Sequence, residues 1–140
     1  MSEPVPVPSS QRILKVLVVD DNEDIAKTTS MLLKLKGYDV ATVADGQAAV
    51  DAARGNRFDV ILMDIGLPIL NGYEAARAIR QQPEGNDVRI IAISGWGQEE
   101  DRRRSQEAGF DLHLVKPVLP ANLFALLEGI KEESKLAPLG

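Results

Sequence analysis

Five short runs of apolar residues alternate along the chain with longer segments in which apolar residues recur at helical spacing. The runs are continuous in hydrophobicity and rich in Val and Ile, which is typical of strands covered on both faces in a parallel sheet. We therefore predict five strands, at Val16–Val19, Tyr38–Val43, Val60–Met63, Arg89–Ile93 and Leu112–Val115.

The segments between the runs predict five helices. In the first, apolar and small residues recur at helical spacing, at Ile25, Thr29, Leu32 and Leu33. The second follows the N-cap candidate Asp45, the third runs from about Tyr73 to Gln82, the fourth from about Gln98 to Ala108, and the last opens at Pro120. Five βα units joined by short connections indicate one α/β domain with a doubly wound sheet.

Both ends of the chain differ in composition from the middle. Three of the eight prolines and three serines fall in the first ten residues, a composition that favours extended, solvated chain over packing. We expect a flexible tail or linker over residues 1–11, the folded domain over 12–133, and a second flexible tail over 134–140.

Composition removes several classes of function. The net charge of −5 argues against a broad nucleic-acid interface or an anionic membrane surface. The absence of cysteine excludes thiolate metal sites and cysteine nucleophiles, and the single histidine excludes a multi-histidine metal site. No run has the length of a membrane span, and the amino terminus lacks the pattern of a secretory signal, so we expect a cytoplasmic protein.

Polar residues stand where the predicted strands end. Asp20 and Asp21 follow the first strand, Asp64 follows the third, Ser94 the fourth and Lys116 the fifth. The carboxyl ends of parallel strands meet at one edge of the sheet, where ligands of such folds bind. We therefore expect three carboxylates, a hydroxyl and an ammonium to converge there.

The charges of this group suggest its chemistry. Gathered carboxylates repel one another, and a hard dication with oxygen ligands, Mg²⁺ or Mn²⁺, removes the conflict. Asp21 and Asp64 would bind it directly and Asp20 through a water molecule. A carboxylate can form an aspartyl phosphate, so Asp64 is the candidate nucleophile. Lys116 would offset charge on the transferred group, and Ser94 would donate a hydrogen bond to it.

The chain resembles the response-regulator receiver family over about Ile13 to Lys131. The resemblance rests on VLVVDDN, LMDIGLPILNG, AISG and LVKP, whose spacing is typical of that family. It implies a flavodoxin-like, three-layered fold with five helices and strand order 2-1-3-4-5. It also implies a cis peptide bond before Pro117.

The resemblance implies a function as well. A sensor histidine kinase or a histidine phosphotransfer protein would pass a phosphoryl group from phosphohistidine to Asp64, with magnesium bound. Ser94 and a residue of the fifth strand would then rearrange and alter the surface around the fourth helix and fifth strand. That surface, with the fifth helix, would also be the face of a homodimer. A domain of this kind is a phosphoacceptor rather than a conventional enzyme.

Three positions depart from the family pattern. His113 stands at the switch position of the fifth strand, where Tyr or Phe is usual. Gly66 follows Asp64 by two residues, so any metal contact there comes from its backbone carbonyl. Trp96 follows Ser94 by two residues, close to the same entrance. In the family, the positions of Gly66 and Trp96 tune the lifetime of the phosphate.

Several interpretations stay open. The chain is either a stand-alone regulator or the receiver module of a hybrid histidine kinase, which the DIGLP and GFDLHLVKP segments resemble. The alternative is a receiver-fold interaction module with little or no phosphorylation. A phosphatase with an Asp nucleophile would need that residue after the first strand, with a second Asp two residues on. The segment Asp20-Asp21-Asn22-Glu23 does not fit this pattern. A flavin-binding protein would need a phosphate-binding loop after the first strand. Asp20 and Asp21 stand there and would repel the cofactor phosphate.

The fourth predicted helix has almost no apolar stripe apart from Ala108. Its acidic and basic residues pair at i,i+4, as Glu99 with Arg103 and Glu100 with Arg104, an order that suits the helix dipole. We interpret it as a solvated helix held by charge pairs, which weak burial makes easy to shift.

Overall fold

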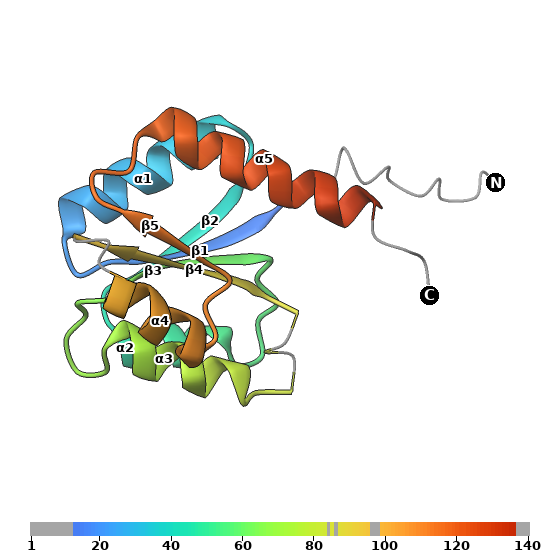
Figure 1. Ribbon diagram of the computed structural model, residues 1–140. Coiled ribbons are helices and arrows are strands. Elements are labelled where there is room, and N and C mark those ends of the chain that lie inside the picture. The colour runs from blue at the N-terminus through green and yellow to red at the C-terminus, as the bar shows by residue number, and fades with distance from the viewer. Residues whose placement is uncertain (1–12, 84, 86, 96–98, 137–140) are drawn as a thin grey trace.

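A five-stranded parallel sheet with strand order β2-β1-β3-β4-β5 forms the centre of the computed structural model, which describes residues 13–83, 85, 87–95 and 99–136. Figure 1 shows α1 and α5 on one face of this sheet and α2, α3 and α4 on the other. The elements are β1 Lys15–Val19, α1 Glu23–Leu35, β2 Asp39–Val43, α2 Gly46–Ala53, β3 Val60–Asp64, α3 Gly72–Arg80, β4 Arg89–Ser94, α4 Glu99–Ala108, β5 Leu112–Val115 and α5 Pro120–Leu136. The predicted flavodoxin-like fold and strand order are confirmed.

The three central strands are buried on both faces, as their continuous apolar runs predict. Every residue of β3 is buried, and Val16, Leu17 and Val19 of β1 are at most 1% exposed. The expectation of burial on both faces is wrong for β2 and β5, which lie at the two edges of the sheet. An edge strand has one neighbour only, so Leu112 and Val115 of β5 remain exposed.

Two apolar cores lie on opposite faces of the sheet. Beneath α1 and α5, residues such as Leu33 and Leu127 pack on Val16 and Ile91. The other core, beneath α2, α3 and α4, includes the buried set Ile61, Met63, Ala75, Ala76, Ile79 and Phe110. Fully burying a large aliphatic side chain contributes about 1.5–3 kcal/mol to the free energy of unfolding. The two cores therefore hold the sheet, and with it the ends of its strands, in place.

Side-chain caps place three helix starts at the carboxyl edge of the sheet. Asn22 accepts a hydrogen bond from the Ile25 backbone N–H at 3.1 Å, and Asp45, as predicted, accepts one from Ala48 at 2.7 Å. Asn71 and Glu74 form a reciprocal capping box at α3. Each cap fixes the point at which a strand-to-helix loop ends and its helix begins. The caps therefore hold the loops around the candidate site in place.

Arg80, at the end of α3, ties α3 to the segment that leads into β5. Its guanidinium donates to the carbonyls of Gly109 at 2.9 Å and of Gly85 and Val88 at 2.6 Å, and to the Asp111 carboxylate at 2.8 Å. The side chain is only 18% exposed. The carboxyl end of α4 is therefore fixed to the body of the domain.

Some boundaries differ from the sequence expectations. Helix α3 ends at Arg80 rather than near Gln82, and α5 continues to Leu136, three residues beyond the expected limit at 133. The limits of the domain and of its tails remain predictions, and residues 1–11 and 137–140 lie outside the described part. The Lys116–Pro117 bond is cis, as predicted. Among the described helices, none is long and apolar enough to cross a membrane.

Candidate functional site

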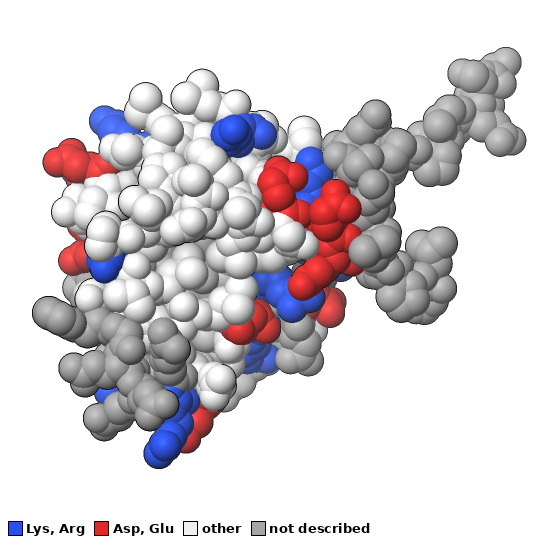
Figure 2. Space-filling view, turned by 45° about the horizontal axis from the view of Figure 1, so that its top comes forward, with Lys and Arg blue, Asp and Glu red and all other residues white. Residues whose placement is uncertain are grey.

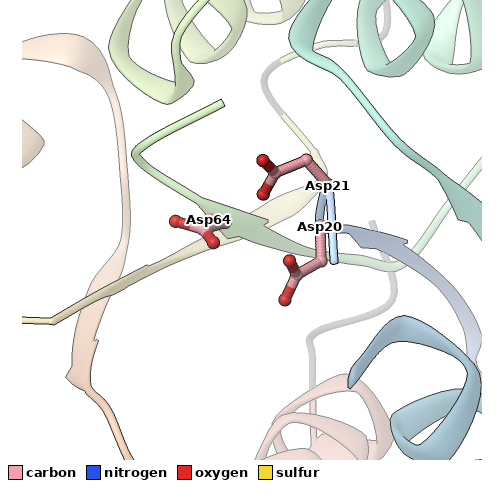
Figure 3. Close-up of side chains that lie close together, drawn as sticks. All are labelled: Asp20, Asp21 and Asp64. Carbon is pink, nitrogen blue, oxygen red and sulfur yellow. The ribbon is translucent and has the colours of Figure 1, made fainter. Parts of the chain in front are cut away.

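The carboxylates of Asp20, Asp21 and Asp64 converge beyond the carboxyl ends of β1 and β3 (Figure 3). One oxygen of each lies within 4.8 Å of one oxygen of the other two. Strands β1 and β3 are neighbours in the sheet, with Val19 paired to Met63, so the residues that follow them meet. The predicted carboxylate cluster is confirmed.

Backbone N–H groups hold two of these carboxylates in place. Asn22 donates to Asp20 Oδ1 at 2.9 Å, and Gly66 donates to Asp64 Oδ1 at 3.0 Å. Asp20 and Asp64 are each 8% exposed, whereas Asp21 is exposed. The site therefore has a buried floor formed by two acids and an open side formed by the third.

Lys116 brings one positive charge to the cluster. Its Nζ lies 2.8 Å from Asp64 Oδ2, and the lysine side chain is about one-third exposed. The Lys116 backbone N–H donates to the Ser94 carbonyl at 2.7 Å, which fixes the residue beside the end of β4. Among the described side chains, three carboxylates thus face one ammonium, and negative charge remains in excess.

Burial and the neighbouring charges act on the pKa values of Asp20 and Lys116. Burial raises the pKa of Asp20 above its ordinary value, and the charges of Asp64 and Asp21 raise it further, against the lowering effects of the Asn22 hydrogen bond and of Lys116. Burial lowers the pKa of Lys116, but the hydrogen bond and charge of Asp64, with the charges of Asp20 and Asp21, raise it overall. The protein environment thus keeps the ammonium protonated.

The donor set fits a hard divalent cation. All the candidate ligand atoms are oxygens, they come from two strand ends, and two of the carboxylates are already oriented by backbone N–H groups. Mg²⁺ prefers a few carboxylates with several waters, and an exposed Asp21 leaves room for those waters. The arrangement of these oxygens is therefore suited to a magnesium ion next to the Asp64 carboxylate.

A protein-family model for the response regulator receiver domain matches residues 16–128. The chain belongs to this family. It is 39% identical over 116 residues to the transcriptional regulatory protein PrrA of Mycobacterium bovis, in a match that covers 83% of this chain and 49% of PrrA. This receiver domain thus spans about half the length of PrrA.

Two further relatives place receiver domains within histidine kinases. The chain is 36% identical over 120 residues to hybrid signal transduction histidine kinase I of Dictyostelium discoideum, covering 81% of this chain and 7% of the kinase. The receiver domain of sensor histidine kinase PA1611 from Pseudomonas aeruginosa has a TM-score of 0.80 and 38% identity, covering 86% of this chain and 99% of that one. Its structure holds a magnesium ion in the active-site cleft. The chain is thus a receiver domain of two-component signalling.

Ser94 and His113 lie on adjacent strands at the rim of the site. Ser94 ends β4, His113 lies in the middle of β5, and a hydrogen bond of 2.6 Å joins Ser94 Oγ to His113 Nε2. Gly66 lies beside Asp64 through its backbone N–H. Trp96 lies outside the described residues, so its place at the entrance remains a prediction.

Sequence reasoning missed one residue of this region. Ser105 of α4 is 1% exposed, and its Oγ lies 3.1 Å from His113 Nδ1. The signal that could have identified it is weak, because Ser105 is one polar residue among many in α4.

An apolar hollow adjoins the site on the side of α1. It has a volume of about 520 Å³, and Asp20, Asp64 and Lys116 form its polar end. The rest of its lining comes from the strands, α1 and the β5–α5 loop: Val18, Val19, Ile25, Thr29, Leu62, Ile93, Pro117, Val118 and Leu123. The acidic site therefore opens towards α1 and the β5–α5 loop.

We predict that Asp20→Asn stabilises the metal-free receiver at neutral pH. Asparagine keeps the oxygen that accepts from Asn22 and removes the negative charge that burial and the neighbouring acids disfavour. The folded-state pKa of Asp20 is raised above its ordinary value of 3.8, so the folded protein disfavours the ionised carboxylate. The resulting loss of stability begins as pH rises above 3.8 and is complete above the folded-state pKa. The gain should therefore shrink as pH falls through that window.

Thermal unfolding in a chelating buffer at several pH values measures this effect. Asp39→Asn, at an exposed position on β2, removes the same charge away from the site and is the matched control. A wild type that melts above Asp20→Asn at neutral pH without metal would contradict the electrostatic account.

Proposed function

We propose that this receiver domain accepts a phosphoryl group on Asp64 from a phosphohistidine, with Mg²⁺ bound, and passes the signal to the surface of α4 and β5. The observation that carries the proposal is the placement of the Asp64 carboxylate between two other acids and the Lys116 ammonium. Within the described part of the chain, this is the group of acids close enough to hold a metal ion.

The residues of this chain would divide the transfer among themselves. A carboxylate oxygen of Asp64 forms a bond to phosphorus while the bond between phosphorus and the donor imidazole nitrogen breaks, and the electron pair of that bond stays with the imidazole. Lys116, already 2.8 Å from Asp64 Oδ2, can contact an oxygen of the transferred group and offset its charge. The Ser94 hydroxyl can donate to another.

Mg²⁺ supplies positive charge that neutralises the gathered carboxylates and binds oxygens of the phosphoryl group. Asp21 and Asp64 would bind the ion through their carboxylates, and Gly66 would bind it through its backbone carbonyl. Asp20 would bind through a water molecule. Mn²⁺ accepts the same oxygen ligands and is expected to substitute. The magnesium ion of the PA1611 receiver supports this assignment.

Two positions would set the lifetime of the aspartyl phosphate. Gly66 offers no side chain to shield Asp64, and a Cβ built at Gly66 would meet only the Asp64 carboxylate, at 3.8 Å. Trp96, which lies outside the described residues, would stand close to the same entrance. We propose that these two residues give this receiver its own rate of hydrolysis.

Incubation with acetyl phosphate and Mg²⁺ tests the assignment of Asp64. We expect the intact mass of the wild type to increase by one phosphoryl group, that of Asp64→Asn to stay unchanged, and a chelator to abolish the increase. Asp39→Asn, an exposed carboxylate on β2, should behave as the wild type. Equal labelling of Asp64→Asn would refute the assignment. A wild type that is never labelled would favour an interaction module that works without phosphorylation.

The partner that donates the phosphoryl group would dock over α1 and the β5–α5 loop. A groove of about 320 Å³ lies between α1 and the start of α5, with Ile25, Leu32, Val118 and Phe124 in its lining. No charged residue occurs from Pro117 to Leu127. Figure 2 shows the corresponding sparsely charged area, whereas charged side chains gather at the side where α5 ends. A helix of a histidine kinase or phosphotransfer protein suits such an apolar groove.

Truncation of Ile25 distinguishes protein donors from small ones. Ile25 is 45% exposed and lines both the groove and the hollow beside the site. With any phosphohistidine protein that transfers to the wild type, Ile25→Ala should lower the transfer rate about tenfold, since it removes an apolar anchor. Labelling by acetyl phosphate should change little.

Met31→Ala is the matched control for this experiment. Met31 is 60% exposed on the same helix and lines neither the groove nor the hollow, so its loss should leave both rates unchanged. Equal slowing by the two variants, or no slowing by Ile25→Ala, would place the docking surface elsewhere.

A further inference from the structure

The single histidine of the chain connects the site to α4. His113 Nε2 lies 2.6 Å from Ser94 Oγ at the end of β4, and His113 Nδ1 lies 3.1 Å from Ser105 Oγ on α4. Ser105 is 1% exposed and His113 is half-buried, so water has little access to compete for the bond between them. Both ring nitrogens are thus bonded to hydroxyls from different elements.

Helix α4 buries few of its described side chains. Of the side chains described on α4, those of residues 103–108, only Ser105 and Ala108 are buried. Arg104 lies over the Tyr73 ring at 4.4 Å from the centroid, and Arg80 holds the Gly109 carbonyl just beyond the helix end. The hydrogen bond between Ser105 and His113 is thus a direct link between this helix and β5.

We propose that Ser105 is a positioning residue of the switch: it holds the His113 imidazole against Ser94, so that a change at the Ser94 hydroxyl is passed through the ring to α4. The proposal rests on the proposed function, because it takes Ser94 as the hydroxyl that meets the phosphoryl group.

The chemistry of the ring makes the two hydrogen bonds depend on each other. A neutral imidazole has one N–H donor and one acceptor nitrogen, whereas each serine hydroxyl can donate or accept. When Ser94 donates to Nε2, the proton of the ring is on Nδ1 and is donated to Ser105. When Ser94 turns its proton to a phosphoryl oxygen on Asp64, the bond at Nε2 lengthens or reverses, and Ser105 must respond at Nδ1.

This coupling differs from the rotation of an aromatic ring into a cavity. A Tyr or Phe at position 113 would offer no pair of ring nitrogens to bridge β4 and α4. In this chain the link depends on a hydroxyl at position 105, so its removal should uncouple α4 from the site while leaving Asp20, Asp21, Asp64 and Lys116 in place.

Hydrogen exchange and nitrogen NMR of wild type, Ser105→Ala and Ser105→Thr test the proposal. The probe is beryllium trifluoride with Mg²⁺, which mimics a phosphoryl group on a carboxylate, and its binding is followed by the rise in melting temperature. Because the chain has one histidine, the two imidazole ¹⁵N signals belong to His113. They are recorded at mildly alkaline pH, where imidazole is ordinarily neutral.

Without the probe, Ser105→Ala should shift the Nδ1 signal and speed the exchange of α4 amides about fivefold, as expected for the loss of one hydrogen bond. With the probe, the wild type should show changes in both ring signals and in α4 exchange. In Ser105→Ala, which still binds the probe, the change in α4 exchange should fall below half of the wild-type change. Ser105→Thr, which keeps the hydroxyl, should restore it.

Ser30→Ala is the matched control, because Ser30 is a buried serine on α1 and its loss should leave the His113 signals and α4 unchanged. A Ser105→Ala variant that binds the probe and shows the full wild-type response of α4 would overturn the relay alone. A wild type that fails to bind the probe would contradict the proposed function, and the relay with it.

Discussion

Mutual repulsion among Asp20, Asp21 and Asp64 is the constraint on which the site depends. The fold brings one oxygen of each within 4.8 Å of the others and, within the described part of the chain, sets the Lys116 ammonium against them. Two of the acids are almost fully buried, where an uncompensated charge is costly. The protein thus maintains an excess of negative charge that a dication can neutralise, and it does so beside the carboxylate that would carry the phosphoryl group.

The rest of the domain holds these charges together against their repulsion. Strands β1 and β3 are adjacent and buried on both faces, so the residues at their ends cannot move apart without disturbing the two cores. The backbone N–H groups of Asn22 and Gly66 orient Asp20 and Asp64. Helix α4 differs: Arg80 fixes its carboxyl end, but among its described side chains, those of residues 103–108, only Ser105 and Ala108 are buried. A rigid acidic centre next to a helix with few buried side chains on its described part is an arrangement suited to a switch.

Much of this could be predicted from the sequence, because the strands and the residues that follow them are local features. The run VILM followed by Asp64 marks both a buried strand and its end. The run VLVV followed by Asp20 and Asp21 does the same for the first strand. The exposure of Leu112 and Val115 was not predictable from their own run, since it depends on β5 lying at the edge. The end of α5 at Leu136 lies two residues before Pro138, a helix-breaking signal that favours this later boundary over position 133. Ser105 has no distinguishing local pattern, because its partner His113 is on another element.

Calorimetric titration of Mg²⁺ into the metal-free protein tests the central claim most directly, with Asp21→Asn for comparison. Asp21 is the exposed acid of the cluster, so the substitution removes a ligand without opening the core. The account predicts one ion per wild-type chain and a binding constant lowered at least tenfold in the variant. A wild type that binds no magnesium, or a variant that binds it equally well, would contradict it.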